Sequence, residues 1–127
     1  MLVQPIVANR VWWFQVWMGE GSPDLALIAH WDPADKVEQP PLESPEPVAG
    51  LEATWHMIDD ALARWTPDDL GQLFPSPPFL REEEKRIFGK RTRQWIIWHV
   101  LEHEIHHGGE LSLALGNYEL PGIYGNA

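Results

Sequence analysis

Residues 95–111 read Trp95-Ile-Ile-Trp-His99-Val-Leu-Glu-His103-Glu-Ile-His106-His107-Gly-Gly-Glu110-Leu111 and hold four of the six histidines of the chain. His99, His103 and His107 recur every fourth position, so on a helix they lie one turn apart on one side. Two imidazoles at positions i and i+4 of a helix can hold one divalent metal ion. The Cα atoms of His99 and His107 would be about 12 Å apart, so one adjacent pair is expected to supply the ligands.

The adjacent pair that the sequence favours is His103 and His107. Apolar residues form a stripe beside this pair, which indicates that the imidazoles face a groove between helices: Ile97, Val100, Leu101 and Leu111. A groove that excludes water can fix an imidazole for coordination. The alternative is a polar stripe on a buried helix, with both histidines hydrogen-bonded to a facing helix.

Other polar residues are weaker candidates for the metal. Glu110 lies one turn beyond His107 and is expected to accept a hydrogen bond from it or to act as an additional ligand. His99 is expected to be a core or rim histidine, and His106 to face outward. His56 lies off the apolar stripe of its own helix.

Composition excludes several classes of function. A chain of 127 residues is expected to form a single domain, residues 1–127. The formal charge of −10 argues against a nucleic-acid partner or an anionic membrane surface. The absence of cysteine excludes disulfides and thiolate sites, so thiol chemistry would need a small thiol from outside. No stretch has the length of a membrane span, and no signal peptide is recognisable, so we expect a cytoplasmic protein.

Periodicity and capping signals predict three long helices. Residues 3–18 are apolar on most of their circumference and end at Gly19 and Gly21, with Pro5 tolerable in the first turn. A second helix begins at Ser44-Pro45-Glu46 and has an apolar residue at alternating steps of three and four: Val48, Leu51, Trp55, Ile58, Leu62 and Trp65. The third is expected to begin after Thr92 and to close at Gly116-Asn117.

The remaining segments are expected to be short or irregular. Short helices are predicted after Ser22-Pro23 and over residues 67–73, a loop over residues 31–43, a solvated charge cluster over residues 81–86, and a surface tail from Tyr118. No segment alternates as a strand does. The prediction is an all-α up-down bundle of three long helices plus short ones, whose fourth long helix is missing or supplied by a partner chain.

The histidine stretch resembles a signature of the DinB-like superfamily. His103-Glu-Ile-His-His107-Gly-Gly-Glu110 is similar to its His-x-x-x-His-Arg-Gly-Gln motif, with Gly108 and Glu110 in place of the arginine and glutamine. Weaker likenesses extend to residues 91–99, 52–55 and 65–70, and so cover most of the chain. The superfamily comprises four-helix bundles related to thiol-dependent bacterial transferases and to the mycothiol-dependent maleylpyruvate isomerase.

The resemblance implies a divalent metal, usually nickel or zinc, held by three histidines. His103 and His107 match two of these ligands. The third precedes a Trp-Phe pair by eight residues in the family, and counting back from Trp13-Phe14 gives Pro5, which cannot ligate. Gln4, Glu110, His56 or another subunit would then have to complete the metal site.

The family's first helix has no counterpart in this sequence. Its absence would leave an apolar flank on the first and last helices, and a homodimer would cover that flank. A natural chain that starts earlier is the alternative.

Two functions follow as hypotheses. The first is a metal-dependent thiol transferase or isomerase that acts on a small electrophile, with a low-molecular-weight thiol as a possible co-substrate. The second is a metal-free dimeric bundle that binds a small ligand in its interhelical groove, or another protein.

Overall fold

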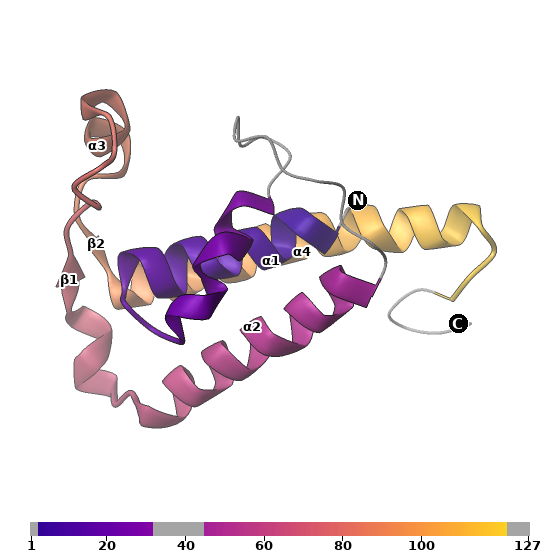
Figure 1. The fold of residues 1–127 in the computed structure, drawn as a ribbon, viewed down its shortest axis with the longest axis horizontal. Coiled ribbons are helices and arrows are strands. Elements are labelled where there is room, and N and C mark those ends of the chain that lie inside the picture. The colour runs from indigo at the N-terminus through magenta and orange to yellow at the C-terminus, as the bar shows by residue number, and fades with distance from the viewer. Residues whose placement is uncertain (1–2, 32–44, 122–127) are drawn as a thin grey trace.

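The computed structural model describes residues 3–31 and 45–121, and these residues form a helical protein with one very small sheet. The predicted all-α class is confirmed. Three helical segments build the body: α1 (Val3–Val11), α2 (Pro45–Arg64) and α4 (Arg93–Asn117). Figure 1 shows α1 and α4 side by side, with α2 running obliquely below them.

The first helix is buried on most sides, as its composition predicted. α1 continues without a break into a π-helical segment, η1 (Trp12–Trp17), so the two together cover the predicted helix. Pro5 lies in the first turn of α1, where its missing N–H leaves no intrahelical hydrogen bond unmade. The buried residues of this segment are Val3, Ile6, Val7, Ala8, Val11, Trp13, Phe14 and Trp17.

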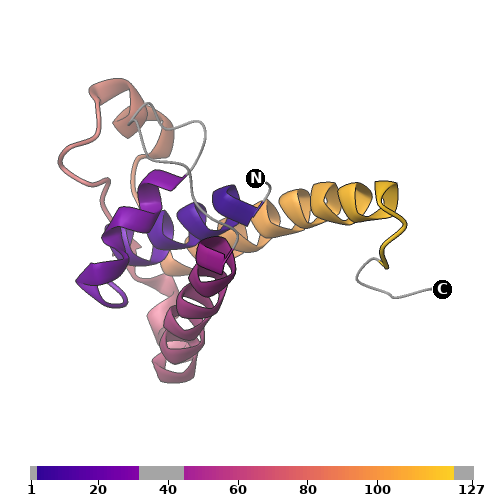
Figure 2. The ribbon, with the colours of Figure 1, turned by 45° about the vertical axis from the view of Figure 1, so that its right-hand side comes forward.

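The last helix, α4, carries the histidines and is the longest element. Its N-cap is Thr92, whose side chain accepts a hydrogen bond from the Trp95 backbone N–H at 3.1 Å. The first half of α4 packs against α1 and, through Trp95 and His99, against Trp13 of η1, while the second half projects past the other helices (Figures 1 and 2). Ile96 and Val100 are buried on the packed half.

The helix α2 packs with a face that the sequence did not single out. The predicted stripe is only partly used, because Val48, Trp55 and Leu62 are 59%, 51% and 44% exposed. The buried face consists of Pro47, Gly50, Thr54, Met57, Ile58 and Ala61. Small residues on this face allow close approach to α1, and that approach decided which side of the helix is covered.

The short elements agree with the sequence in part. Two 3₁₀ segments, η2 (Pro23–Trp31) and η3 (Pro67–Gly71), occupy the predicted short helices. The Thr66 N–H donates to Asp69 at 2.7 Å, closing a capping box at η3. The predicted loop over residues 31–43 lies outside the described residues after Trp31, and so does the tail from residue 122.

The charge cluster over residues 81–86 is solvated, as predicted, but two features of the middle of the chain were not predicted. The charge cluster includes a helix, α3 (Glu82–Phe88), with Glu84 accepting from the Arg81 N–H at its start. A pair of antiparallel strands, β1 (Leu73–Phe74) and β2 (Arg91–Thr92), joins the flanks of this region. Strands of two residues are too short to show alternation, so hydrophobic periodicity could not reveal them.

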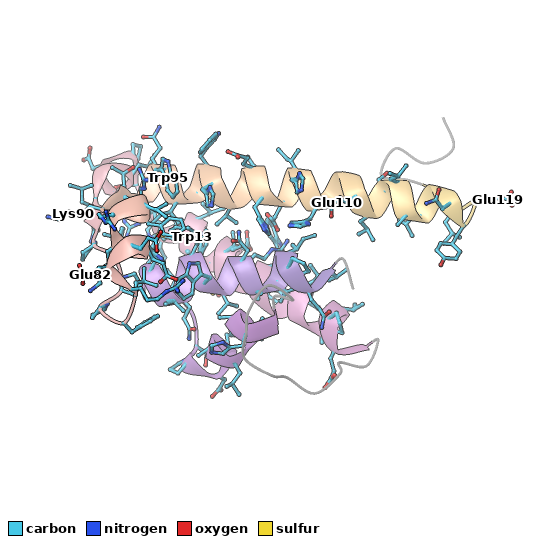
Figure 3. The ribbon with its side chains drawn as sticks, turned by 90° about the horizontal axis from the view of Figure 1, so that it is seen from above. Trp13, Glu82, Lys90, Trp95, Glu110 and Glu119 are labelled. Carbon is cyan, nitrogen blue, oxygen red and sulfur yellow. The ribbon has the colours of Figure 1, made fainter. Side chains whose placement is uncertain are left out.

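Aromatic side chains fill the junction between η1, α3 and α4. The Trp13 ring packs against Trp17, Trp95 and Phe88 at centroid distances of 4.8, 5.5 and 5.8 Å. Figure 3 shows Trp13 and Trp95 at the same end of the molecule, where α4 begins. This cluster anchors the N-terminal half of the histidine helix.

Candidate metal centre

The histidines of α4 divide between its packed side and its exposed side. His103 and His107 are half-buried, and their rings meet edge to face at a centroid distance of 4.4 Å. His106 is exposed, as predicted, and its ring lies 5.0 Å from that of His107. The spacing of four residues therefore does place His103 and His107 together, one helical turn apart.

Glu110 connects two of these imidazoles. His107 Nδ1 lies 3.1 Å from Glu110 Oε2, and His106 Nε2 lies 3.0 Å from Oε1 of the same carboxylate. Glu110 is on the projecting half of α4, away from the aromatic cluster at Trp13 and Trp95 (Figure 3). One carboxylate thus fixes the orientation of both rings, in the way that carboxylates orient liganding histidines.

Donor atoms of His106, His107 and Glu110 lie within 4.8 Å of one another. With a metal–ligand distance of about 2.1 Å, two donors 3.0 Å apart subtend roughly 90° at an ion. His106 was the residue that sequence reasoning missed, although its spacing of four from Glu110 was a usable signal. The His106 ring faces outward, but a carboxylate one turn further along the same helix still reaches it.

A second arrangement uses the residues that the sequence favoured. The bond from Glu110 to Nδ1 of His107 leaves Nε2 of that ring for coordination, next to the His103 ring. In this arrangement Glu110 orients a ligand and does not bind the ion itself. Both arrangements share His107, and they differ in whether His103 or His106 and Glu110 contribute.

An ion pair holds the helix beside the histidines in place. Arg10 on α1 pairs with Glu104 on α4, and its Nη1 donates to the Leu51 carbonyl at 3.0 Å and to Thr54 Oγ1 at 3.1 Å. The single guanidinium therefore ties α1 to both α2 and α4. Because Glu104 directly follows His103, this contact fixes the position of the first histidine of the pair along α1.

His99 belongs to the aromatic cluster and not to the donor group. Its ring stacks on Trp95 at 4.7 Å and meets the edge of Trp13 at 5.1 Å. Burial lowers the pKa of His99, Glu102 opposes this by raising it, and Arg91 lowers it further. The expectation of a rim or core histidine agrees with this position.

We expect His99 to make the fold less stable in acid. The folded state has the lower pKa, so the unfolded chain binds more protons as the pH falls through the ordinary imidazole range. The contribution of the neutral, buried His99 to the free energy of unfolding is fully present above the ordinary imidazole pKa. It is lost as the pH falls through the lowered pKa of the folded state. Urea unfolding of the wild type and of His99→Gln at about pH 7.5 and about pH 5 should show a smaller acid-induced loss in the variant. An equal loss in both proteins would contradict this role.

The remaining predicted site residues lie elsewhere. His56 is exposed on α2, and Gln4 is half-buried in the first turn of α1. Side chains added at Gly108 or Gly109 would meet nothing within 4 Å in the described part of the chain, so close helix approach does not explain these glycines there. A hollow of 520 Å³ lies along the histidine side of α4, lined by His99, Glu102, His103, Ile105 and His106.

Comparison with known proteins supplies one match. The sequence model of the DinB superfamily matches residues 6–111, which is more than half of the chain and includes every histidine of α4. Neither the search of curated proteins nor the search of solved structures found a significant match. Within residues 3–31 and 45–121, no helix combines the length and the hydropathy of a membrane span.

Proposed function

The chain belongs to the DinB superfamily, and from this premise we propose that it binds one divalent metal ion, nickel or zinc, through His103 and His107. The observation that carries the proposal is the arrangement around His107. Its ring centroid lies 4.4 Å from that of His103, and its Nδ1 lies 3.1 Å from Glu110 Oε2, so that with Nδ1–H donating to this carboxylate Nε2 is available for an ion. Imidazole nitrogen is a preferred donor for both metals.

Burial favours this pair over the exposed alternative. His103 is half-buried, whereas the side chain of His106 is 69% exposed and that of Glu110 is 43% exposed. A ligand that is held in place before the ion arrives loses less conformational freedom on binding. His103 and His107 are therefore the ligands that we propose, with Glu110 orienting the second of them.

The reaction that we propose is transfer of a low-molecular-weight thiol to a small electrophile. Two protein ligands leave coordination positions open, and a divalent ion with open positions acidifies a bound water or thiol. The chain has no cysteine, so the thiol must be a separate molecule. The hollow beside His99, His103 and His106 has a volume in the range of small-molecule sites and would receive it.

Calorimetric titration of the chelator-treated protein with nickel and with zinc tests the binding site. We expect one ion per chain, about 100-fold weaker binding in His103→Ala, and about tenfold weaker binding in Glu110→Gln. His106→Ala is the matched control on the same helix and should bind as the wild type does. Metal binding releases protons from the ligands, so the measured heat should vary with the buffer.

Two outcomes would redirect this proposal. If His106→Ala weakens metal binding and His103→Ala leaves it unchanged, the ion is held by His106, His107 and Glu110. If the wild type takes up neither metal, the metal-free binding module becomes the function to pursue, since Pro5 stands where the family places its third ligand.

A further inference from the structure

Most basic side chains of this acidic chain are paired or buried, but those just before the histidine helix are not. The chain has 19 acidic and 9 basic residues, so carboxylates are in excess. The basic residues that pair with a carboxylate are Arg10, Arg64, Arg81 and Lys85. Arg93 is buried. In the described part of the chain, Arg86, Lys90 and Arg91 remain without a carboxylate partner, and they are therefore candidates for binding an anion from outside the chain.

Arg91 differs from the other two because its guanidinium is held in place. Its Cζ lies 4.4 Å from the centroid of the Trp95 ring, and its Nη2 donates to the Ile87 carbonyl at 3.1 Å. Arg86 and Lys90 are exposed, whereas Arg91 is half-buried. Its Nε is covered and has no hydrogen-bond partner among the residues that the structure describes. A guanidinium carries several N–H donors, so Arg91 is a fixed cation with more donors than the chain satisfies.

A stack of rings connects Arg91 to the hollow beside the histidines. His99 stacks on the same Trp95 ring, with the centroids 4.7 Å apart and the planes 11° apart. His99 also lines the hollow of 520 Å³, together with His103. Burial is the main cause of the lowered pKa of His99, and the charge of Arg91 lowers it further, so the field of this cation reaches the wall of the hollow. A molecule in the hollow can therefore extend along α4 toward Arg91.

We propose that Arg91 binds a carboxylate group of the small molecule that occupies this hollow, which rests on the proposed function in taking the hollow as the ligand site. A guanidinium can form two parallel hydrogen bonds to a carboxylate, and stacking on an aromatic ring holds its plane for this contact. Trp95 and His103 are about 12 Å apart along the axis of α4. The ligand is therefore an extended molecule of about this length, with its anionic end over Trp95.

Glu102 limits the direction in which such a ligand can lie. It is an exposed acid that lines the same hollow as His103 and His106. A carboxylate beside it would be repelled, whereas an amino group would be attracted. The anionic end of the ligand should lie toward Arg91, and a neutral or cationic end should lie beside Glu102. A small peptide thiol, with a carboxylate at one end and an amino group at the other, has this distribution of charge.

Nuclear magnetic resonance titration of the isotope-labelled, metal-free, full-length protein with S-methylglutathione tests the proposal. This probe carries carboxylates and an amino group, and its blocked sulfur cannot form a thiolate. We expect a dissociation constant on the order of 1 mM, with a clear shift of the Trp95 indole N–H signal. Arg91→Gln should weaken binding at least about tenfold, since a hydrogen-bonded charge pair is lost. The diethyl ester of the probe, which lacks the carboxylates, should bind the wild type as weakly.

The matched control is Arg86→Gln, which removes the same charge from an exposed neighbour and should bind the probe as the wild type does. Arg91→Lys keeps the charge but loses the planar fork, so it should weaken binding by a smaller factor. This second variant decides the matter if Arg91→Gln does not fold.

Three results would overturn the proposal. They are equal binding by the folded Arg91 variants and the wild type, equal binding of the probe and its diester, and no binding by the wild type at about 20 mM probe. Because no ion is present in the titration, none of these results depends on whether His103 and His107 bind a metal.

Discussion

His107→Ala is expected to abolish metal binding by the isolated protein. His107 belongs to both possible ligand sets, because its ring contacts His103 and also shares Glu110 with His106. Loss of a residue that merely orients a ligand costs about 10–100-fold in affinity, and loss of the ligand itself should cost at least about 100-fold.

Elemental mass spectrometry of protein purified without a chelator or a histidine tag measures this effect. The wild type should carry about one ion per chain, and His107→Ala should carry essentially none. His56→Ala is the control, since His56 is an exposed histidine on a different helix. Equal metal content in His107→Ala and the wild type would show that His107 is not a ligand and would contradict both arrangements.

Pro5, which stands where the family resemblance implies a third histidine ligand, is the reason why loss of His107 should have so large an effect. In a site with three protein imidazoles, loss of one still leaves a chelating pair, whereas the pair proposed here would be reduced to a single imidazole. α1 begins at Val3, and Pro5 lies in its first turn without any donor to offer. We expect the chain to rely on Glu110 to keep His107 oriented, because preorganisation offsets part of the affinity that a third ligand would contribute.

The helices could be predicted because their signals are local. Thr92 caps α4 through its own hydroxyl, and Thr66 and Asp69 close the capping box at η3, so each element is fixed by residues within one turn. The family resemblance was confirmed. It could be recognised from the sequence because the histidine motif that carries it lies within one helix.

The prediction of which face of α2 is buried failed because that face is decided by tertiary contacts. Periodicity marked the stripe through Trp55 and Leu62, but α2 turns Gly50, Thr54 and Ala61 toward α1. The reason is that Arg10 of α1 reaches the Leu51 carbonyl and the Thr54 hydroxyl, which no pattern within α2 reveals. The ligand set remains a prediction, because four residues with donor atoms, His103, His106, His107 and Glu110, lie close together on one helix and allow more than one set of ligands.

Trp13→Ala is expected to cause the largest loss of stability of any single substitution proposed here. Trp13 is 2% exposed, and its ring packs against Trp17, Trp95 and Phe88 as well as His99. Truncation of a buried tryptophan costs about 3–5 kcal/mol, which is a large part of the roughly 5–15 kcal/mol that stabilises a domain. Urea unfolding followed by circular dichroism measures the difference.

The neighbouring Trp12 provides the control for this substitution. Its ring is only half-buried and packs against Phe79 at 6.0 Å, so Trp12→Ala should cost clearly less. Trp13→Ala also removes the ring whose packing covers part of His99, which exposes the imidazole to water. Since burial is the main cause of the lowered pKa of His99, the pKa should rise toward its ordinary value, and the acid-induced loss of stability should shrink. Equal stability of the two tryptophan variants would show that the aromatic cluster does not anchor the histidine helix.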